Sequence, residues 1–252
     1  MYKYLLLAIP LFFFSCEDTP DPKKVVSEDE LPDRPKSLEE YAKKHVESAL
    51  RIPANEKYTL KIYKENLDVD DKQDAIISVN RMKFAMDEAA RSENTAKRAE
   101  VAFMGNFNYI FYYDGGLDLI SPQIAIPSSA LLPLDILFEN VSSNDYKDII
   151  INFRIRNASY RDYYTVKNHT PSRIFQWKNF DGMGTSKVEA FTFSYEQGKV
   201  AEPKNIVIHK AKLGTVPKNA DLNTYIPTIT ATSQLERMFF YLPSQSTYVT
   251  EK

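Results

Sequence analysis

The chain has 252 residues, and its 32 Lys and Arg nearly balance its 34 Asp and Glu, giving a formal net charge of −2. Nucleic-acid binding depends on a basic stripe that neutralises phosphates, so this balance argues against a nucleic-acid partner. Apolar residues make up 43% of the chain and aromatic residues 13%, which is enough for a substantial core. Architectures that need a Gly in every structural repeat are disfavoured, because the chain has only seven Gly residues.

The first 16 residues have the layout of an export signal. Lys3 precedes an unbroken apolar run over residues 4–14, which ends at a small residue and then Cys16. A permanent membrane helix needs roughly 20 apolar residues, and this run is shorter and is interrupted by Pro10. We therefore predict that residues 1–16 are a signal peptide that is processed at Cys16 and not retained as a membrane anchor.

The end of this signal, from Phe13 to Cys16, resembles the lipobox of bacterial lipoproteins. The resemblance implies that Cys16 receives diacylglycerol and further acyl chains such as palmitate, which anchor the mature protein in a membrane. Phe13 departs from the pattern, since the family usually has Leu, Val or Ile there. Cys16 is the only Cys of the chain and cannot form an internal disulfide. The alternative is an ordinary signal peptide with an incidental Cys.

Residues 17–36 are rich in Pro and in charges of both signs, which predicts a disordered tether. Glu17 and Asp18 directly follow the lipidation site and resemble surface-export signals of some diderm bacteria. A solvated linker explains the same residues. The predicted location is therefore the outer membrane of the cell envelope, with either a surface-exposed or a periplasm-facing domain.

The folded part begins with a predicted helix over residues 37–52, where Ser37 is placed to cap an apolar stripe and Pro53 ends it. Alternation then predicts a strand over residues 58–63 and a partner strand over residues 75–79. Residues 82–103 favour a helix, with a loop over residues 92–95 between two extended pieces as the alternative.

From residue 107 onward, short alternating segments separated by polar turns predict strands over residues 107–113, 151–155, 191–195 and 206–208. The pattern is lost from about residue 214 and returns as a short apolar element over residues 235–242. We predict one β-rich α+β domain over residues 37–252, an antiparallel β-sandwich or open barrel with an N-terminal helix.

One Asp-rich segment follows the first predicted strand and precedes the second. Its oxygen-bearing side chains have the spacing of a calcium loop, and the candidate ligands are Asn66, Asp68, Asp70 and Asp74. The segment resembles the calcium loop of FG-GAP and VCBS repeat proteins. It departs from that pattern where Asp71 replaces the turn Gly and Asn66 replaces an Asp. The alternative is an Asx-rich hairpin turn without a metal.

A broader resemblance covers residues 58–180, whose order of Asp-rich loop, aromatic strand and later apolar strands looks like small exported bacterial proteins with one FG-GAP-like loop. Such proteins have no assigned activity, so the resemblance bears on the fold. Within this region lies a stretch rich in aromatic and Arg residues, the types enriched at binding hot spots. The candidate binding residues are Tyr160, Tyr163, Tyr164 and Trp177. The alternative is ordinary packing within a sandwich.

Hydrolase, phosphate-loop and dinucleotide motifs are not found in the sequence, which therefore offers no catalytic residues. We expect a membrane-anchored envelope lipoprotein that acts as a non-enzymatic binding or assembly module for an envelope protein or a glycan. The alternative is a hydrolase of envelope or extracellular polymer, with calcium as a possible structural ion.

Overall fold

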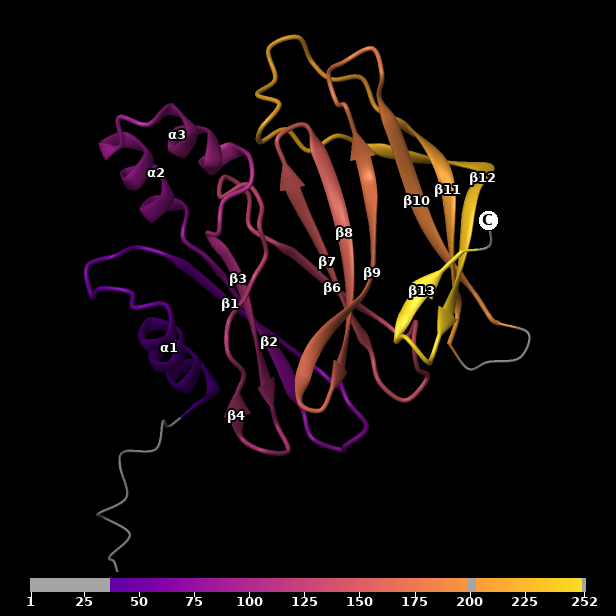
Figure 1. Ribbon diagram of the computed structural model, residues 1–252, viewed down its shortest axis with the longest axis horizontal. Helices are drawn as coiled ribbons and strands as arrows, with labels where there is room; N and C mark the ends of the chain where they lie inside the picture. Colours follow the sequence, from indigo (N-terminus) through magenta and orange to yellow (C-terminus); the bar gives the residue numbers. More distant parts are fainter. Residues whose placement is uncertain (1–36, 199–202, 251–252) are drawn as a thin grey trace, which may run out of the picture. The chain divides into compact units, whose positions relative to one another are not determined.

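The computed structural model describes residues 37–198 and 203–250. The predicted signal peptide, Cys16 and the tether over residues 17–36 lie outside the described residues. The N-terminal helix is confirmed as α1 (Leu38–Ala49), and the Ser37 hydroxyl caps it by accepting a hydrogen bond from the Glu40 amide at 3.2 Å. The buried side chains of Ala42 and Val46 hold α1 against one face of the first sheet (Figure 1).

The first sheet is antiparallel and has five strands. They are β1 (Thr59–Glu65), β2 (Asp74–Asn80), β3 (Asn108–Asp114), β4 (Leu119–Ile120) and β5 (Ile124–Ala125). The predicted β1–β2 hairpin is confirmed, with Thr59 opposite Asn80 and Glu65 opposite Asp74. Every residue of β2 is buried because this strand lies inside the sheet and both of its faces are covered.

Two short helices, α2 (Met82–Arg91) and α3 (Thr95–Ala102), connect β2 to β3. The predicted helix over residues 82–103 is confirmed as helical but is divided in two. The loop of the alternative interpretation is present, because Ser92 to Asn94 are not helical and the Asn94 side chain caps α3 by accepting from the Ala96 amide at 2.9 Å. The alternative of two extended pieces around this break is wrong. Its flanks are rich in Ala, Lys and Glu, which favour helix.

The second sheet is antiparallel and has eight strands in the order β13-β12-β11-β10-β9-β8-β7-β6. They are β6 (Asp135–Glu139), β7 (Asp148–Ile155), β8 (Ala158–Lys167), β9 (Thr170–Asp181), β10 (Glu189–Glu196), β11 (Asn205–Leu213), β12 (Ile229–Leu242) and β13 (Thr247–Val249).

One strand of this sheet begins earlier than expected. The prediction of an irregular chain from about residue 214 to residue 235 is wrong from Ile229 onward, where β12 begins. Two register shifts against β11 break the two-residue period, and most side chains in the first half of β12 are not buried. The alternation that identifies a strand is therefore absent there.

The two sheets pack face to face around a shared core that includes Ile76 and Tyr112 from the first sheet and Ile149 and Ile151 from the second. A second core lies on the other face of the eight-stranded sheet. That sheet curls over this core, since Thr247 in β13 donates a hydrogen bond to the Ile174 carbonyl in β9 at 2.9 Å. The predicted β-sandwich is confirmed, and the sheets do not close into a barrel.

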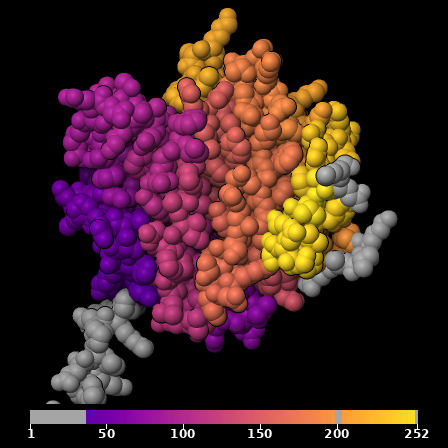
Figure 2. Space-filling view, viewed as in Figure 1, coloured from indigo at the N-terminus to yellow at the C-terminus, as the bar shows by residue number. Residues whose placement is uncertain are grey.

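On the face shown in Figure 2, atoms of the first sheet and its helices, in indigo to magenta, lie beside those of the second sheet, in orange. Within the described part of the chain, no helix is long and apolar enough to span a membrane.

Candidate functional site

Asp74 begins β2 and is completely buried at the end of the Asp-rich loop. One carboxylate oxygen accepts a hydrogen bond from the Leu67 amide and the other accepts from the Gly115 amide, each at 3.0 Å. Burial raises the pKa of Asp74 above its ordinary value, and the two amide donors partly oppose that shift. Asp74 therefore ties the β1–β2 loop to the β3–β4 turn.

Next to this tie, Asp68, Asp114 and His169 form what we call the Asp–His cluster. One potential ligand atom from each lies within 4.8 Å of the other two. The three residues come from the β1–β2 loop, the end of β3 and the β8–β9 hairpin, so the cluster joins both sheets. His169 has a φ of 61° in its turn, and its Nδ1 lies 2.5 Å from an oxygen of the buried Asp114.

The carboxylate oxygens of the Asp–His cluster already have protein partners. Those of Asp68 accept from the Asp70 amide at 2.9 Å and from the Tyr112 hydroxyl at 3.2 Å. The second oxygen of Asp114 accepts from the Leu117 amide at 2.8 Å. Burial, followed by the nearby charge of Asp74, raises the pKa of Tyr112, which keeps this hydroxyl a donor. The cluster can thus hold the two sheets together by hydrogen bonds alone.

The structure brings together only part of the predicted calcium set. Asp68 belongs to the Asp–His cluster, whereas both oxygens of Asp74 bind backbone amides. Asp70 accepts from the Lys72 amide at 2.7 Å, and a Cβ added at the adjacent Gly116 would fall 2.1 Å from its other oxygen. The contacts of Asn66 are made by its backbone, which receives a hydrogen bond from the Lys147 amide at 3.0 Å. Calcium binding stays a prediction.

The predicted aromatic residues do not share one exposed face. Tyr163 is completely buried in the second core, where its hydroxyl lies 2.9 Å from that of Tyr195, and Tyr164 is buried between the sheets. Tyr160 is half-buried and stacks on Phe153 with a centroid distance of 5.8 Å. Trp177 is half-buried in the second core. Successive strand residues point to opposite faces, which explains why Tyr163 and Tyr164 separate.

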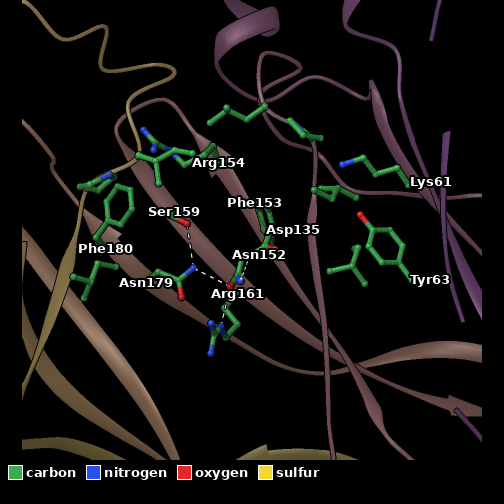
Figure 3. A pocket seen from close by; sticks show the side chains of 17 residues that line it. Lys61, Tyr63, Asp135, Asn152, Phe153, Arg154, Ser159, Arg161, Asn179 and Phe180 are labelled. Carbon is green, nitrogen blue, oxygen red and sulfur yellow. Dashed lines mark hydrogen bonds between the residues drawn. The ribbon is translucent and has the colours of Figure 1, made fainter. Parts of the chain in front are cut away.

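A larger site, which sequence analysis missed, lies where the edge of the first sheet approaches β6 to β9 and residues 226–229. We call it the Arg pocket, and its cavity volume is about 530 Å³ (Figure 3). It is lined by Lys61, Tyr63, Leu132, Pro133, Leu134, Asp135, Ile136, Asn152, Phe153, Arg154, Ser159, Arg161, Asn179, Phe180, Ile226, Pro227 and Ile229. Its volume and largely apolar lining are typical of a small-molecule site.

Hydrogen bonds fix the polar side chains of the Arg pocket, as the dashed lines in Figure 3 show. Asn152 donates to the Asp135 carboxylate at 2.8 Å, and its amide oxygen accepts from Arg161 Nε at 2.8 Å. The Asn179 amide nitrogen donates to that same oxygen at 3.2 Å and to the Ser159 hydroxyl at 3.1 Å. These side chains are therefore held in place before any ligand arrives.

Arg154 is a buried cation, only 7% exposed, that has no salt bridge to a carboxylate within residues 37–198 and 203–250. Its guanidinium donates to the carbonyls of Tyr225 at 2.9 Å and of Leu222 and Arg156 at 2.8 Å, and it lies 4.9 Å from the centre of the Phe180 ring. Its Nε is buried and has no hydrogen-bond partner in the part of the chain that the structure describes. Burial lowers the pKa of Arg154 from its ordinary value.

No family model, no curated protein and no solved structure matches this chain. The predicted lipobox and FG-GAP-like loop therefore stay predictions.

Proposed function

We propose that this chain is a membrane-anchored lipoprotein of the cell envelope whose β-sandwich is a binding module, with the Arg pocket as its ligand site. One observation carries the proposal: a cavity of about 530 Å³ whose apolar wall surrounds polar side chains already fixed by hydrogen bonds. Such preorganisation lowers the entropy cost of binding.

The chemistry of the Arg pocket favours binding over catalysis. Asp135 is the one carboxylate among its lining residues, and Asn152 already holds it. General acid and base catalysis of hydrolysis usually needs a second acid or a His within reach, and the pocket lining contains neither.

Elsewhere in the second sheet, the Ser194 hydroxyl lies 3.1 Å from His209 Nε2, the arrangement that a hydrolase would require of a nucleophile and its base. The other ring nitrogen of His209 is buried and has no hydrogen-bond partner among the described residues, so none of them orients this ring as a third group would. Neither residue lines the Arg pocket. This pair gives the hydrolase alternative little support.

Anchoring rests on the signal-like residues 1–16 and on Cys16. The expected anchor is acyl chains on Cys16, because lipidation contributes about 0.8 kcal/mol per buried CH₂ and two or more chains hold a protein on a membrane stably. Cys16→Ala should move the protein from the membrane fraction to the soluble fraction of its own cells. A variant that still sediments with membranes would overturn the lipid anchor.

The binding role can be tested with N-phenylnaphthylamine, an uncharged dye that fluoresces in apolar sites. The mature chain, residues 16–252 with Cys16→Ala, is used, because it lacks both the acyl chains and the apolar run over residues 4–14, which would itself bind the dye. Ile226 lines the pocket and is 76% exposed, so Ile226→Glu should weaken dye binding without disturbing the core. Val69 is 82% exposed and is not among the pocket residues, which makes Val69→Glu the matched control. Equal dye binding by both variants would overturn the proposed site.

A further inference from the structure

The charge of the Arg pocket narrows the class of ligand, and this inference rests on the proposed function. Lys61, Arg154 and Arg161 line the pocket, whereas Asp135 is its only acid. None of these three cations forms a salt bridge with a carboxylate in the described part of the chain. The lining thus carries an excess of positive charge that no carboxylate of residues 37–198 and 203–250 neutralises by a salt bridge.

Arg161 is the cation best placed to contact a ligand. It is half-buried, and its Nε donates to the Asn152 amide oxygen at 2.8 Å. Its guanidinium carbon lies 4.4 Å from the centre of the Phe193 ring. These two contacts, together with hydrogen bonding toward the Tyr163 and Tyr195 hydroxyls, fix the plane of the guanidinium. The N–H donors that remain are the part of the group that a carboxylate or sulfonate can accept from.

Arg154 reinforces the positive field from a buried position. Its contacts are neutral carbonyls, which satisfy donors without compensating the charge. A buried cation without a counterion is costly because the protein interior screens charge poorly. A bound anion would recover part of that cost.

The remaining lining selects an apolar ligand body. Ile136, Phe153, Phe180 and Pro227 are buried and form one part of the wall, while the exposed Ile226 forms the part nearer to solvent. A strongly hydrated anion would leave these surfaces without a partner, and an uncharged apolar molecule would further desolvate the two guanidinium groups.

We propose that the Arg pocket binds a small amphipathic anion, an apolar or aromatic body that carries one carboxylate or sulfonate, with the charged group hydrogen-bonded to Arg161. The ligand's apolar body lies against Phe180 and Ile226, and Arg154 stabilises its charge through the field rather than by direct contact.

The test compares two dyes of similar shape, anilinonaphthalene sulfonate and uncharged N-phenylnaphthylamine, in fluorescence titrations of the mature chain, residues 16–252 with Cys16→Ala. Arg161→Met removes the charge while keeping an unbranched side chain, and Arg161→Lys keeps the charge. Arg237 is exposed and lies outside the pocket lining, so Arg237→Met is the matched control. Near-ultraviolet circular dichroism of each variant checks the tertiary packing.

Arg161→Met should weaken binding of the sulfonate about tenfold, the effect of losing one charge-assisted contact, while leaving binding of the uncharged dye unchanged. Arg161→Lys should retain most of the preference for the sulfonate, and Arg237→Met should behave like the parent chain. Equal changes for both dyes, or no change for either, would overturn the anion inference while leaving the pocket as a binding site. If the parent chain binds neither dye, the proposed function falls as well.

Discussion

The Asp–His cluster and the Arg pocket concentrate opposite charges in one sandwich and satisfy them differently. In the Asp–His cluster and at the neighbouring Asp74, the carboxylate oxygens are bound by amide, hydroxyl or imidazole groups of the protein. In the Arg pocket, two guanidinium groups face only neutral partners. The difference indicates a structural role for the acidic site and agrees with the binding role proposed for the basic one.

The largest effect is expected at the acidic site, from Asp74→Ala. The substitution leaves the Leu67 and Gly115 amides without their acceptors, so it should lower the free energy of unfolding by about 3 kcal/mol. Urea unfolding measures this loss. Asp71 is exposed in the same loop, and Asp71→Ala should stay within about 0.5 kcal/mol of the parent chain. Similar losses in both variants would show that the tie does not hold the two turns together.

A smaller loss of stability is expected in the Arg pocket from Arg154→Met. The variant loses three hydrogen bonds to carbonyls, two of them in the segment before β12, but it no longer buries an uncompensated charge. These effects partly cancel, so we expect a loss of about 1–2 kcal/mol and faster amide hydrogen exchange in residues 214–228. Arg237→Met is again the control, and unchanged exchange in Arg154→Met would contradict the assigned role.

The pH dependence of stability provides a finer comparison at Asp74. Its pKa in the folded protein is raised by burial, so the folded state holds this proton more tightly than the unfolded state. The resulting stabilisation is present at low pH and is lost as the pH rises from about 3.9 through the raised value. The stability advantage of the parent chain over Asp74→Asn should therefore shrink between about pH 4 and neutrality. Urea unfolding across this range would contradict the prediction if that advantage grew.

The smallest effect is expected from calcium. The carboxylates of the Asp–His cluster already accept hydrogen bonds from protein donors, so the melting temperature should be the same with millimolar calcium and with a chelator. A cation present at a free concentration of a hundred times its Kd would add about 2.7 kcal/mol to the free energy of unfolding. A higher melting temperature in calcium than in chelator would therefore contradict the contrast between the two sites, because the acidic site would then also bind a ligand.

Much of the fold follows from local patterns in the sequence. Ser37 and the apolar stripe predict α1, and alternation predicts the β1–β2 hairpin. The Asp–His cluster does not follow, because Asp114 and His169 meet Asp68 only through the pairing of distant strands and the packing of the two sheets. The turn residues around Asp68, Asp114 and His169 predict three hairpins, but they do not predict which of these hairpins lie next to one another in the folded protein.

The Arg pocket shows a second limit of sequence patterns. Asn152 and Arg154 alternate with apolar residues, which is typical of a strand face exposed to solvent. In the structure Arg154 is buried because residues 222–229 pass over this face. Residues 214–228 contain neither helix nor strand, so no periodicity in the sequence indicates that they cover a pocket.

The most direct test of the central claim is to identify what the pocket carries in its own cells. The parent chain and the Ile226→Glu and Val69→Glu variants are purified from the source organism, and the small molecules released from each by denaturation are compared by mass spectrometry. An amphipathic organic anion that accompanies the parent chain and Val69→Glu, and is depleted from Ile226→Glu, is the predicted result. The same set of molecules from all three chains would contradict the assignment of the Arg pocket as the binding site.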